Sequence, residues 1–215
     1  MFTVERPDVE RVLKDYGIPE SLQDFSELQR YHYERYDPDS REVRLILRLT
    51  LEGRAPLVLR FKNEEDVTQT LLESQCRFAQ TLRENGIPTP RQYRAEGRFT
   101  RWYRIGGYEV LAALEDFAEG QLTVTDAAAA EQTGALLART HRIAETLDLH
   151  VENRVLFDPF AENDLFDVEG FRSVGPALSG EDKVLFDRIL AKYDAVMDRL
   201  APLRQAPRYA VQGDI

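Results

Sequence analysis

Two short segments carry charged side chains that a strand or a turn would hold in a fixed direction. In segment 57–62, the two-residue period of a β-strand puts Arg60 and Lys62 on one face, opposite a leucine- and phenylalanine-rich face. Further along, Gly213 lets the backbone bend after a short apolar run, so that the carboxylate of Asp214 can project into a cleft. Such cations can meet a phosphate group, and such a carboxylate can orient or deprotonate a hydroxyl. The plain alternatives are a solvated basic sheet face and an aspartate that caps a surface turn.

The composition limits the class of protein. The 215 residues include 28 basic and 38 acidic side chains, for a net charge of −10, and 43% are hydrophobic. This apolar share exceeds that of disordered chains, and the negative charge argues against nucleic-acid binding. The single cysteine, Cys76, cannot form an intrachain disulfide, the three histidines are not spaced as metal ligands, and neither a signal peptide nor a membrane span is apparent. We therefore expect a globular, cytoplasmic protein with no nucleic-acid or membrane partner.

The order of predicted elements is β-rich first and helical afterwards. The expected strands, of which the first three form an antiparallel meander, are 27–36, 43–51, 56–62, 92–95, 99–105 and 108–114. The expected helices are 8–16, 64–85, about 125–147 and 181–203. This order predicts an α+β chain of two lobes with a crevice between them, divided near Phe117.

Five short motifs follow one another along the chain, namely Leu59-Arg60, Gly86 to Pro90, Phe117 to Gly120, Leu137 to His141, and Gln212-Gly213-Asp214. Their shared order and spacing, over nearly the whole chain, resemble the aminoglycoside phosphotransferase and choline kinase family. The resemblance implies a protein-kinase-like α+β fold, with a nucleotide-binding β-rich lobe at 1–117 and a partial helical lobe at 118–215. It also implies transfer of the γ-phosphate of ATP to a hydroxyl of a small-molecule substrate.

The resemblance makes Asp214 the carboxylate that orients or deprotonates the acceptor hydroxyl. Phosphoryl transfer depends on positioning and charge neutralisation rather than on covalent help from the protein. Gln212 stands where the family usually has a histidine. A glutamine can hydrogen-bond the loop backbone as a neutral imidazole would, but it does not titrate.

The resemblance also assigns nucleotide-binding residues in the β-rich part. Arg60 falls at the family's phosphate-binding lysine, with Lys62 on the same face, and a planar guanidinium is not equivalent to a lysine ammonium there. The family glutamate that pairs with this cation maps onto Gln75, a neutral amide on the helical stripe that faces the sheet. Glu73 points elsewhere on the helical wheel. The plain alternative for Gln75 is a partly buried polar residue.

The remaining nucleotide-binding residues lie in a hinge and a loop. In the family, adenine contacts the hinge backbone, which maps onto Asp116, Phe117 and Ala118. The plain alternative for Phe117 is an aromatic side chain of the core. Ser40 is the only hydroxyl of loop 37–40, where a phosphate-covering turn would lie. That loop has two acids and no glycine, which is unfavourable for a polyanion.

The acceptor and the metal are the least determined features. Segment 151–179 is rich in acids, which would suit a cationic acceptor such as an amine or would simply form a solvated loop. The family's Mg²⁺ ligands follow the catalytic aspartate and would fall beyond Ile215. Since Mg²⁺ supplies much of the transition-state stabilisation, we expect this chain to be inactive as it stands. It would be either the N-terminal portion of a longer kinase, which we favour, or a truncated product that retains at most weak nucleotide binding.

Two other hypotheses remain. Gln212, Gln75 and the glycine-free loop are also compatible with a kinase-shaped module that binds or regulates without catalysis. An unrelated α+β protein would show no two-lobe crevice. The sequence does not determine the oligomeric state.

Overall fold

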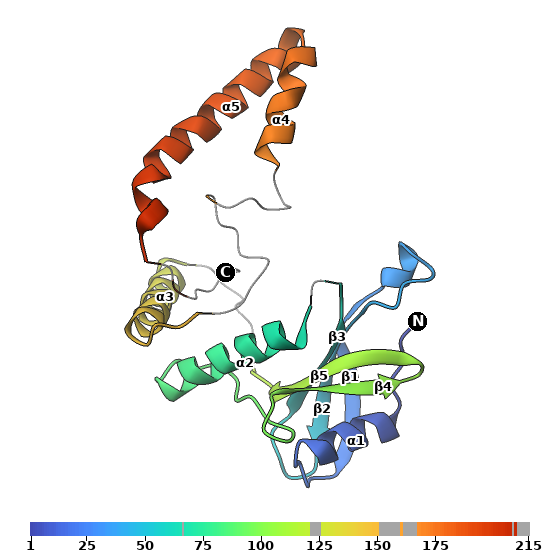
Figure 1. Cartoon of the computed structure of the whole chain (residues 1–215). Coiled ribbons are helices and arrows are strands. Elements are labelled where there is room, and N and C mark those ends of the chain that lie inside the picture. The colour runs from blue at the N-terminus through green and yellow to red at the C-terminus, as the bar shows by residue number, and fades with distance from the viewer. Residues whose placement is uncertain (66, 121–125, 151–159, 161–166, 208, 210–215) are drawn as a thin grey trace. The chain divides into compact units, whose positions relative to one another are not determined.

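Figure 1 shows a computed structural model of the chain, which describes residues 1–65, 67–120, 126–150, 160, 167–207 and 209. The chain divides into two compact units, Met1–Asn153 with Tyr209–Ile215, and Arg154–Arg208. This grouping does not test the lobe boundary predicted near Phe117, which stays a prediction. No helix in the described ranges is long and apolar enough to cross a bilayer.

The first unit contains a five-stranded antiparallel sheet in the order β1-β2-β3-β5-β4. Its strands are β1 (Leu22–Tyr31), β2 (Val43–Leu51), β3 (Leu57–Asn63), β4 (Thr100–Ile105) and β5 (Tyr108–Asp116). Its helices are α1 (Arg6–Asp15), α2 (Gln69–Glu84) and α3 (Ala127–Thr146). The predicted meander and the helices of this unit are therefore confirmed, but the first strand lies at Leu22–Tyr31 rather than 27–36, because Tyr33–Arg35 form a 3₁₀ turn. The strand expected at 92–95 is instead a pair of isolated bridges, Gln92 with Glu115 and Ala95 with Arg98.

One face of the sheet packs against α1 and forms the core of this unit. Every second residue of β2 is buried, and Leu47 lies opposite Leu59 of β3 in register. Val9 and Val12 of α1 are fully buried in the same cluster. Burying a leucine or valine side chain contributes about 1.5–3 kcal/mol, so this alternation fixes which face of each strand points inward.

α1 is also held to the sheet by a buried hydroxyl. The hydroxyl of Tyr16, the residue after α1, donates to the carbonyl oxygens of Phe99 at 2.9 Å and Ala112 at 2.7 Å. Burial raises the pKa of Tyr16 well above its usual value, so the donor keeps its proton. Arg6, at the other end of the helix, donates to the carbonyl oxygen of Leu22 at 2.7 Å.

The opposite face of the sheet is polar and is covered in part by α2 (Figure 1). α2 begins at Thr68, whose hydroxyl accepts a 3.1 Å hydrogen bond from the N–H of Leu71 and so caps the helix. It ends before Gly86, whose φ of +80° is a conformation that favours glycine. Leu72 and Leu82 of α2 are buried.

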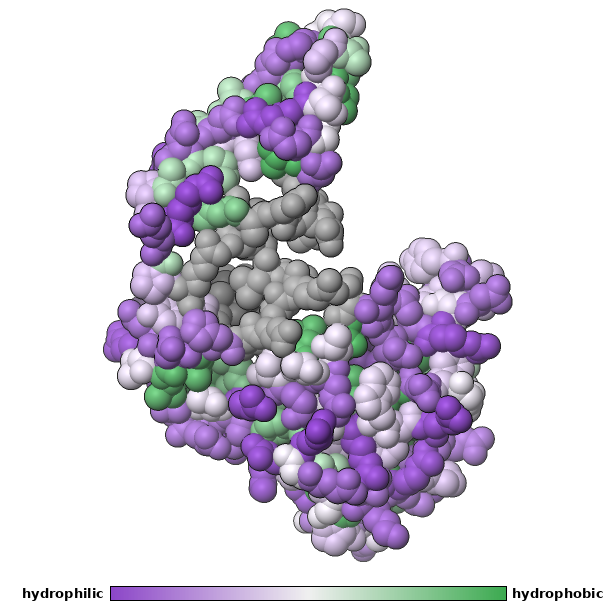
Figure 2. All heavy atoms as spheres, viewed as in Figure 1, coloured by the Kyte–Doolittle hydropathy of each residue, from purple (hydrophilic) through white to green (hydrophobic). Residues whose placement is uncertain are grey.

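The second unit is a pair of helices, α4 (Val168–Val174) and α5 (Gly180–Leu200), with short 3₁₀ turns after each. The rings of Phe171 and Phe186 stack at 4.7 Å between centroids, and Gly175 lies so close to Phe186 that a Cβ there would sit 2.6 Å from the ring. The sequence analysis predicted α5 but read the region of α4 as loop. Polar side chains cover most of the visible surface of the first unit, and apolar side chains lie among polar ones over α4 and α5 (Figure 2).

Candidate functional site

Four basic side chains share the polar face of the sheet. Arg44 and Arg48 lie four residues apart on β2, with Ile46 between them on the same face, and Arg60 and Lys62 lie two residues apart on β3. Arg44 lies directly opposite Lys62 in the antiparallel register. Because like charges held this close repel one another, such a face is stabilised by an anion.

A cavity of about 200 Å³ lies between this face and α2. It brings together three residues that the sequence analysis assigned to nucleotide binding, Arg60, Lys62 and Gln75. The other residues that line it are Leu72, Cys76, Ala79, Gln92, Leu111, Ala113 and Glu115.

Arg60 is paired with a carboxylate of the neighbouring strand. Its Nε donates to Oε1 of Glu115 at 2.7 Å, and one of its terminal nitrogens lies 2.5 Å from the same oxygen. The other oxygen of Glu115 accepts a 2.7 Å hydrogen bond from the amide of Gln92. The Glu115 side chain is 13% exposed, so this ion pair is partly shielded from water.

The glutamate expected on the helix is not part of this cluster. Gln75, at the mapped position, lines the cavity with an exposed side chain. Glu73 instead accepts hydrogen bonds of 2.6 Å from the backbone N–H and from the hydroxyl of Thr100. The prediction that Glu73 points elsewhere is therefore supported by its hydrogen bonds.

Lys62 is the cation of this cavity whose protonation is most easily changed. Burial lowers its pKa, the nearby positive charges of Arg44 and Arg60 lower it further, and Glu64 opposes them. Glu64 is already held by the guanidinium of Arg44 and the hydroxyl of Tyr33. An anion bound here would favour the charged form of Lys62.

Arg48 extends the basic face toward the predicted hinge. Its guanidinium carbon lies 4.9 Å from the centre of the Phe117 ring, a cation–π distance. Its Nε is buried and, within the described part of the chain, has no hydrogen-bond partner; the Nε of Arg44 is in the same state. A buried N–H without a partner costs free energy, so both groups would gain from a ligand acceptor.

The predicted hinge residues are already engaged by the protein. The N–H of Asp116 donates to the carbonyl oxygen of Arg91, and that of Phe117 to the carbonyl oxygen of Pro56, both at 3.0 Å. The Asp116 carboxylate accepts a 2.6 Å hydrogen bond from Tyr93. Ala118 is exposed. Two of the three backbone donors expected to face adenine are thus used within the fold.

Ser40 lies in the connection between β1 and β2 and takes part in a local turn. Its N–H donates to the carbonyl oxygen of Asp37 at 3.0 Å, and its hydroxyl accepts from the N–H of Glu42 at 3.2 Å. Glu42 in turn accepts a 3.0 Å hydrogen bond from the N–H of Glu65, which ties this connection to the segment before α2. Ser40 does not line the cavity.

The predicted catalytic residue Asp214, with Gln212, lies outside the described residues. Within the described ranges, no three histidine, cysteine, aspartate or glutamate side chains gather as metal ligands would. The described residues therefore do not form a Mg²⁺ site.

Glu115 and Gln92 are site residues that the sequence analysis missed. A signal for Glu115 was present, because Leu111, Ala113 and Glu115 alternate along β5 and so share one face. Its contact with Arg60 depends on the pairing of β3 with β5, which are separated by α2 and β4.

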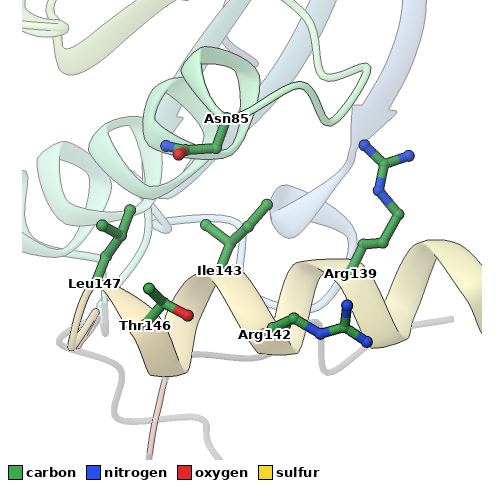
Figure 3. Close-up of a pocket in the computed structure, with 6 residues that line it drawn as sticks. All are labelled: Asn85, Arg139, Arg142, Ile143, Thr146 and Leu147. Atoms are coloured by element: carbon green, nitrogen blue, oxygen red, sulfur yellow. The ribbon is translucent and has the colours of Figure 1, made fainter.

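A second cavity, of about 270 Å³, lies between the end of α2 and α3 (Figure 3). It is lined by Asn85, Arg139, Arg142, Ile143, Thr146 and Leu147. Arg139 donates to the carbonyl oxygen of Gly86 at 3.0 Å, which attaches α3 to the end of α2. A guanidinium at a helix C-terminus also complements the helix dipole, so we read this contact as structural.

The sheet, the covering helix and the basic face together define an α+β, protein-kinase-like fold. Amicoumacin kinase hAmiN, solved in complex with AMP-PNP, Ca2+ and Ami, is similar with a TM-score of 0.54 and 17% sequence identity, over 93% of this chain and 55% of that chain. The chain thus spans about half the length of that kinase. No protein-family model and no curated protein matches it. The fold implied by the sequence motifs is confirmed.

Proposed function

We propose that the chain is the nucleotide-binding part of a cytoplasmic small-molecule kinase of the aminoglycoside phosphotransferase and choline kinase type, which transfers the γ-phosphate of ATP to a substrate hydroxyl. The observation that carries this proposal is the cavity beneath α2 that Arg60 and Lys62 line, on a sheet face that also carries Arg44 and Arg48. Glu64 pairs with Arg44 and Glu115 pairs with Arg60, and an anionic ligand would meet the remaining positive charge of Lys62 and Arg48.

The cavity would hold the phosphates rather than the whole nucleotide. Its volume of about 200 Å³ is below the roughly 300–1,000 Å³ of sites for drug-sized ligands. Lys62 and Arg60 would contact phosphate oxygens, and the base would lie toward Phe117 and Ala118. Arg48, whose Nε has no hydrogen-bond partner among the described residues, would supply a further donor.

Asp214, which follows Gly213 in the sequence motif, would be the carboxylate that contacts the acceptor hydroxyl. Such a residue orients the hydroxyl or takes its proton, while the cations stabilise charge on the phosphoryl group. The similar kinase was solved with a nucleotide analogue and Ca2+. We expect ATP and Mg²⁺ to be used here, with metal ligands outside the described residues, and a small hydroxyl-bearing acceptor that the acidic segment 151–179 would favour as a cation.

Nucleotide binding tests this proposal. AMP-PNP with Mg²⁺, at about 100 times its dissociation constant, should stabilise the protein by roughly 2.7 kcal/mol in a thermal unfolding assay. Lys62→Met should weaken this binding. Arg104→Met is the matched control, because Arg104 is exposed and pairs with Glu109 at the outer edge of the sheet. Equal binding by both variants, or none by the unaltered protein, would contradict the proposal.

A second candidate, a kinase-shaped module that binds without catalysis, is favoured by the hinge. The N–H groups of Asp116 and Phe117 are used within the fold, and Arg48 covers the Phe117 ring. Transfer of a labelled γ-phosphate to a panel of aminated and neutral alcohols, measured in a protein that also contains the metal ligands expected after Asp214, separates the two. Binding without turnover supports the module, whereas turnover that Asp214→Asn abolishes supports the kinase.

A further inference from the structure

We propose that Glu115 of β5 is the positioning residue that orients the phosphate-binding cation Arg60, in place of a glutamate on α2. This inference rests on the proposed function and concerns how its site is assembled. The carboxylate that pairs with Arg60 would thus come from the sheet, whereas the sequence motif suggests one from the helix.

The geometry of Glu115 is that of a fixed counter-ion. Its Oε1 receives the Nε of Arg60 at 2.7 Å and a terminal nitrogen at 2.5 Å, while its Oε2 receives Gln92 at 2.7 Å. Both carboxylate oxygens are thus engaged from different directions. With the Glu115 side chain 13% exposed and that of Arg60 41% exposed, the carboxylate is the buried anchor and the guanidinium the accessible end.

The strand register explains why Glu115 can reach Arg60. Arg60 pairs with Ala113 and Val58 pairs with Glu115, so the two charged residues are diagonal neighbours on one face of adjacent strands. Diagonal neighbours lie about 7–8 Å apart at the backbone, which long side chains span. The ion pair therefore belongs entirely to the sheet.

α2 offers no competing carboxylate at this cavity. Its two acids are Glu73, which accepts two hydrogen bonds from Thr100, and Glu84, which accepts a 2.9 Å hydrogen bond from Gln80 at the far end of the helix. Position 75, which faces the cavity, is a glutamine. A displacement of α2 would consequently leave the orientation of Arg60 unchanged.

Pairing also sets the charge of the cavity. Glu115 neutralises Arg60, so that Lys62 carries the net positive charge beside it. Without the carboxylate, Arg60 would stand uncompensated next to Lys62 and would disfavour the charged amine. The pair thus keeps Arg60 in place and Lys62 protonated.

Affinity for AMP-PNP with Mg²⁺, measured by calorimetry, tests the assignment. Glu115→Gln should weaken binding about 10- to 100-fold, as expected for the loss of a charge-assisted pair. Glu73→Gln, the matched control on α2, should change it less than about threefold. In the Glu115→Gln background, Gln75→Glu should restore at least tenfold, because it returns a carboxylate to the cavity from the helix side.

A second measurement does not need nucleotide. The pKa of Lys62, followed by the NMR shift of its 13Cε, should fall further in Glu115→Gln and stay unchanged in Glu73→Gln. Gln92→Leu removes the amide that holds the Glu115 carboxylate and should weaken AMP-PNP binding about fivefold. This variant replaces Glu115→Gln in the test if Glu115→Gln does not fold.

Three outcomes would overturn the assignment: unchanged or tighter binding in Glu115→Gln, equal losses in Glu115→Gln and Glu73→Gln, or an unchanged Lys62 titration. If the unaltered protein does not bind AMP-PNP, the proposed function fails, while the Lys62 titration still decides whether Glu115 neutralises Arg60.

Discussion

Glu73 of α2 accepts hydrogen bonds of 2.6 Å from both the backbone N–H and the hydroxyl of Thr100, the first residue of β4. Thr100 is fully buried, and its carbonyl oxygen accepts a 3.0 Å hydrogen bond from Gln69 of the same helix. One side of α2 is thereby attached to the outer strand of the sheet. The glutamate nearest to the predicted position in sequence is a structural residue.

This attachment predicts a stability defect without a binding defect. Glu73→Gln should lower the free energy of unfolding by about 1–3 kcal/mol, because a carboxylate that accepts two buried hydrogen bonds is replaced by a weaker acceptor. Chemical denaturation measures this change. Glu84→Gln, which alters an exposed acid of the same helix, should change stability by less than 0.5 kcal/mol or so. A similar loss in both variants would contradict the interpretation.

Lys62 gives a prediction of pH dependence. Burial lowers its pKa in the folded protein from the ordinary value of 10.5, which applies to the unfolded chain. Between these two pKa values the unfolded chain therefore binds more protons at this amine than the folded protein does. Stability therefore rises with pH through that window, and below it the buried charge opposes folding. Lys62→Met should raise the melting temperature at pH 7, with a gain that shrinks as the pH rises toward 10.5 and is lost above it. Lys192→Met, an exposed control in α5, should show no such trend.

Tyr16 tests the attachment of α1. Tyr16→Phe removes the donor shared by the carbonyl oxygens of Phe99 and Ala112 and should destabilise the protein by about 1–2 kcal/mol. Differential scanning calorimetry would record this as a lower melting temperature. Tyr36→Phe is the control, since Tyr36 is 80% exposed. A neutral effect of Tyr16→Phe would show that water replaces the lost donor.

Gly175 tests the packing of the second unit. A Cβ at this position would lie 2.6 Å from Cε1 of Phe186, so Gly175→Ala should destabilise the α4–α5 pair by roughly 1–3 kcal/mol. Hydrogen exchange of the amides in α5 would report the loss. Gly134→Ala in α3, where a Cβ meets nothing within 4 Å, should stabilise by up to about 1 kcal/mol. Unchanged exchange in Gly175→Ala would mean that the Phe186 ring moves aside freely.

Cys76 lines the cavity and should be an unreactive thiol. Burial raises its pKa to about 12, with the charge of Glu115 adding to the effect, so the thiolate is scarce at pH 8. Alkylation by iodoacetamide should be on the order of 1,000-fold slower than for a free cysteine of ordinary pKa near 8.5. Unfolding in urea should restore the ordinary rate, and rapid labelling of the folded protein would contradict this prediction.

Local patterns predicted much of the fold. The alternation of buried residues along β2, and of Arg60 and Lys62 with buried Leu59 and Phe61 in β3, predicted both strands and the face that the two cations share, because burial of one strand face is a property of the segment itself. The capping residues Thr68 and Asp126 lie where α2 and α3 begin, and the start of α3 falls within two residues of the predicted one. Such signals need no knowledge of distant partners.

The site could be predicted in part. Arg60, Lys62 and Gln75 meet at one cavity, as expected, but the partner of Arg60 was not foreseen because β3 and β5 pair across an intervening helix. The engagement of the hinge N–H groups likewise depends on Arg91 and Pro56, which are distant in sequence. α4 was missed because its seven residues are too few for a clear helical period.

The position of β5 has a consequence for synthesis on the ribosome. It is the last strand of the sheet to be made, yet it lies between β3 and β4, so an emerging polypeptide shorter than 116 residues has an open β3 edge and a detached β4. The first three strands can assemble as successive hairpins while translation continues, but closure waits for Asp116. The nascent protein is therefore most in need of chaperone protection in the interval between completion of β3 and release of β5.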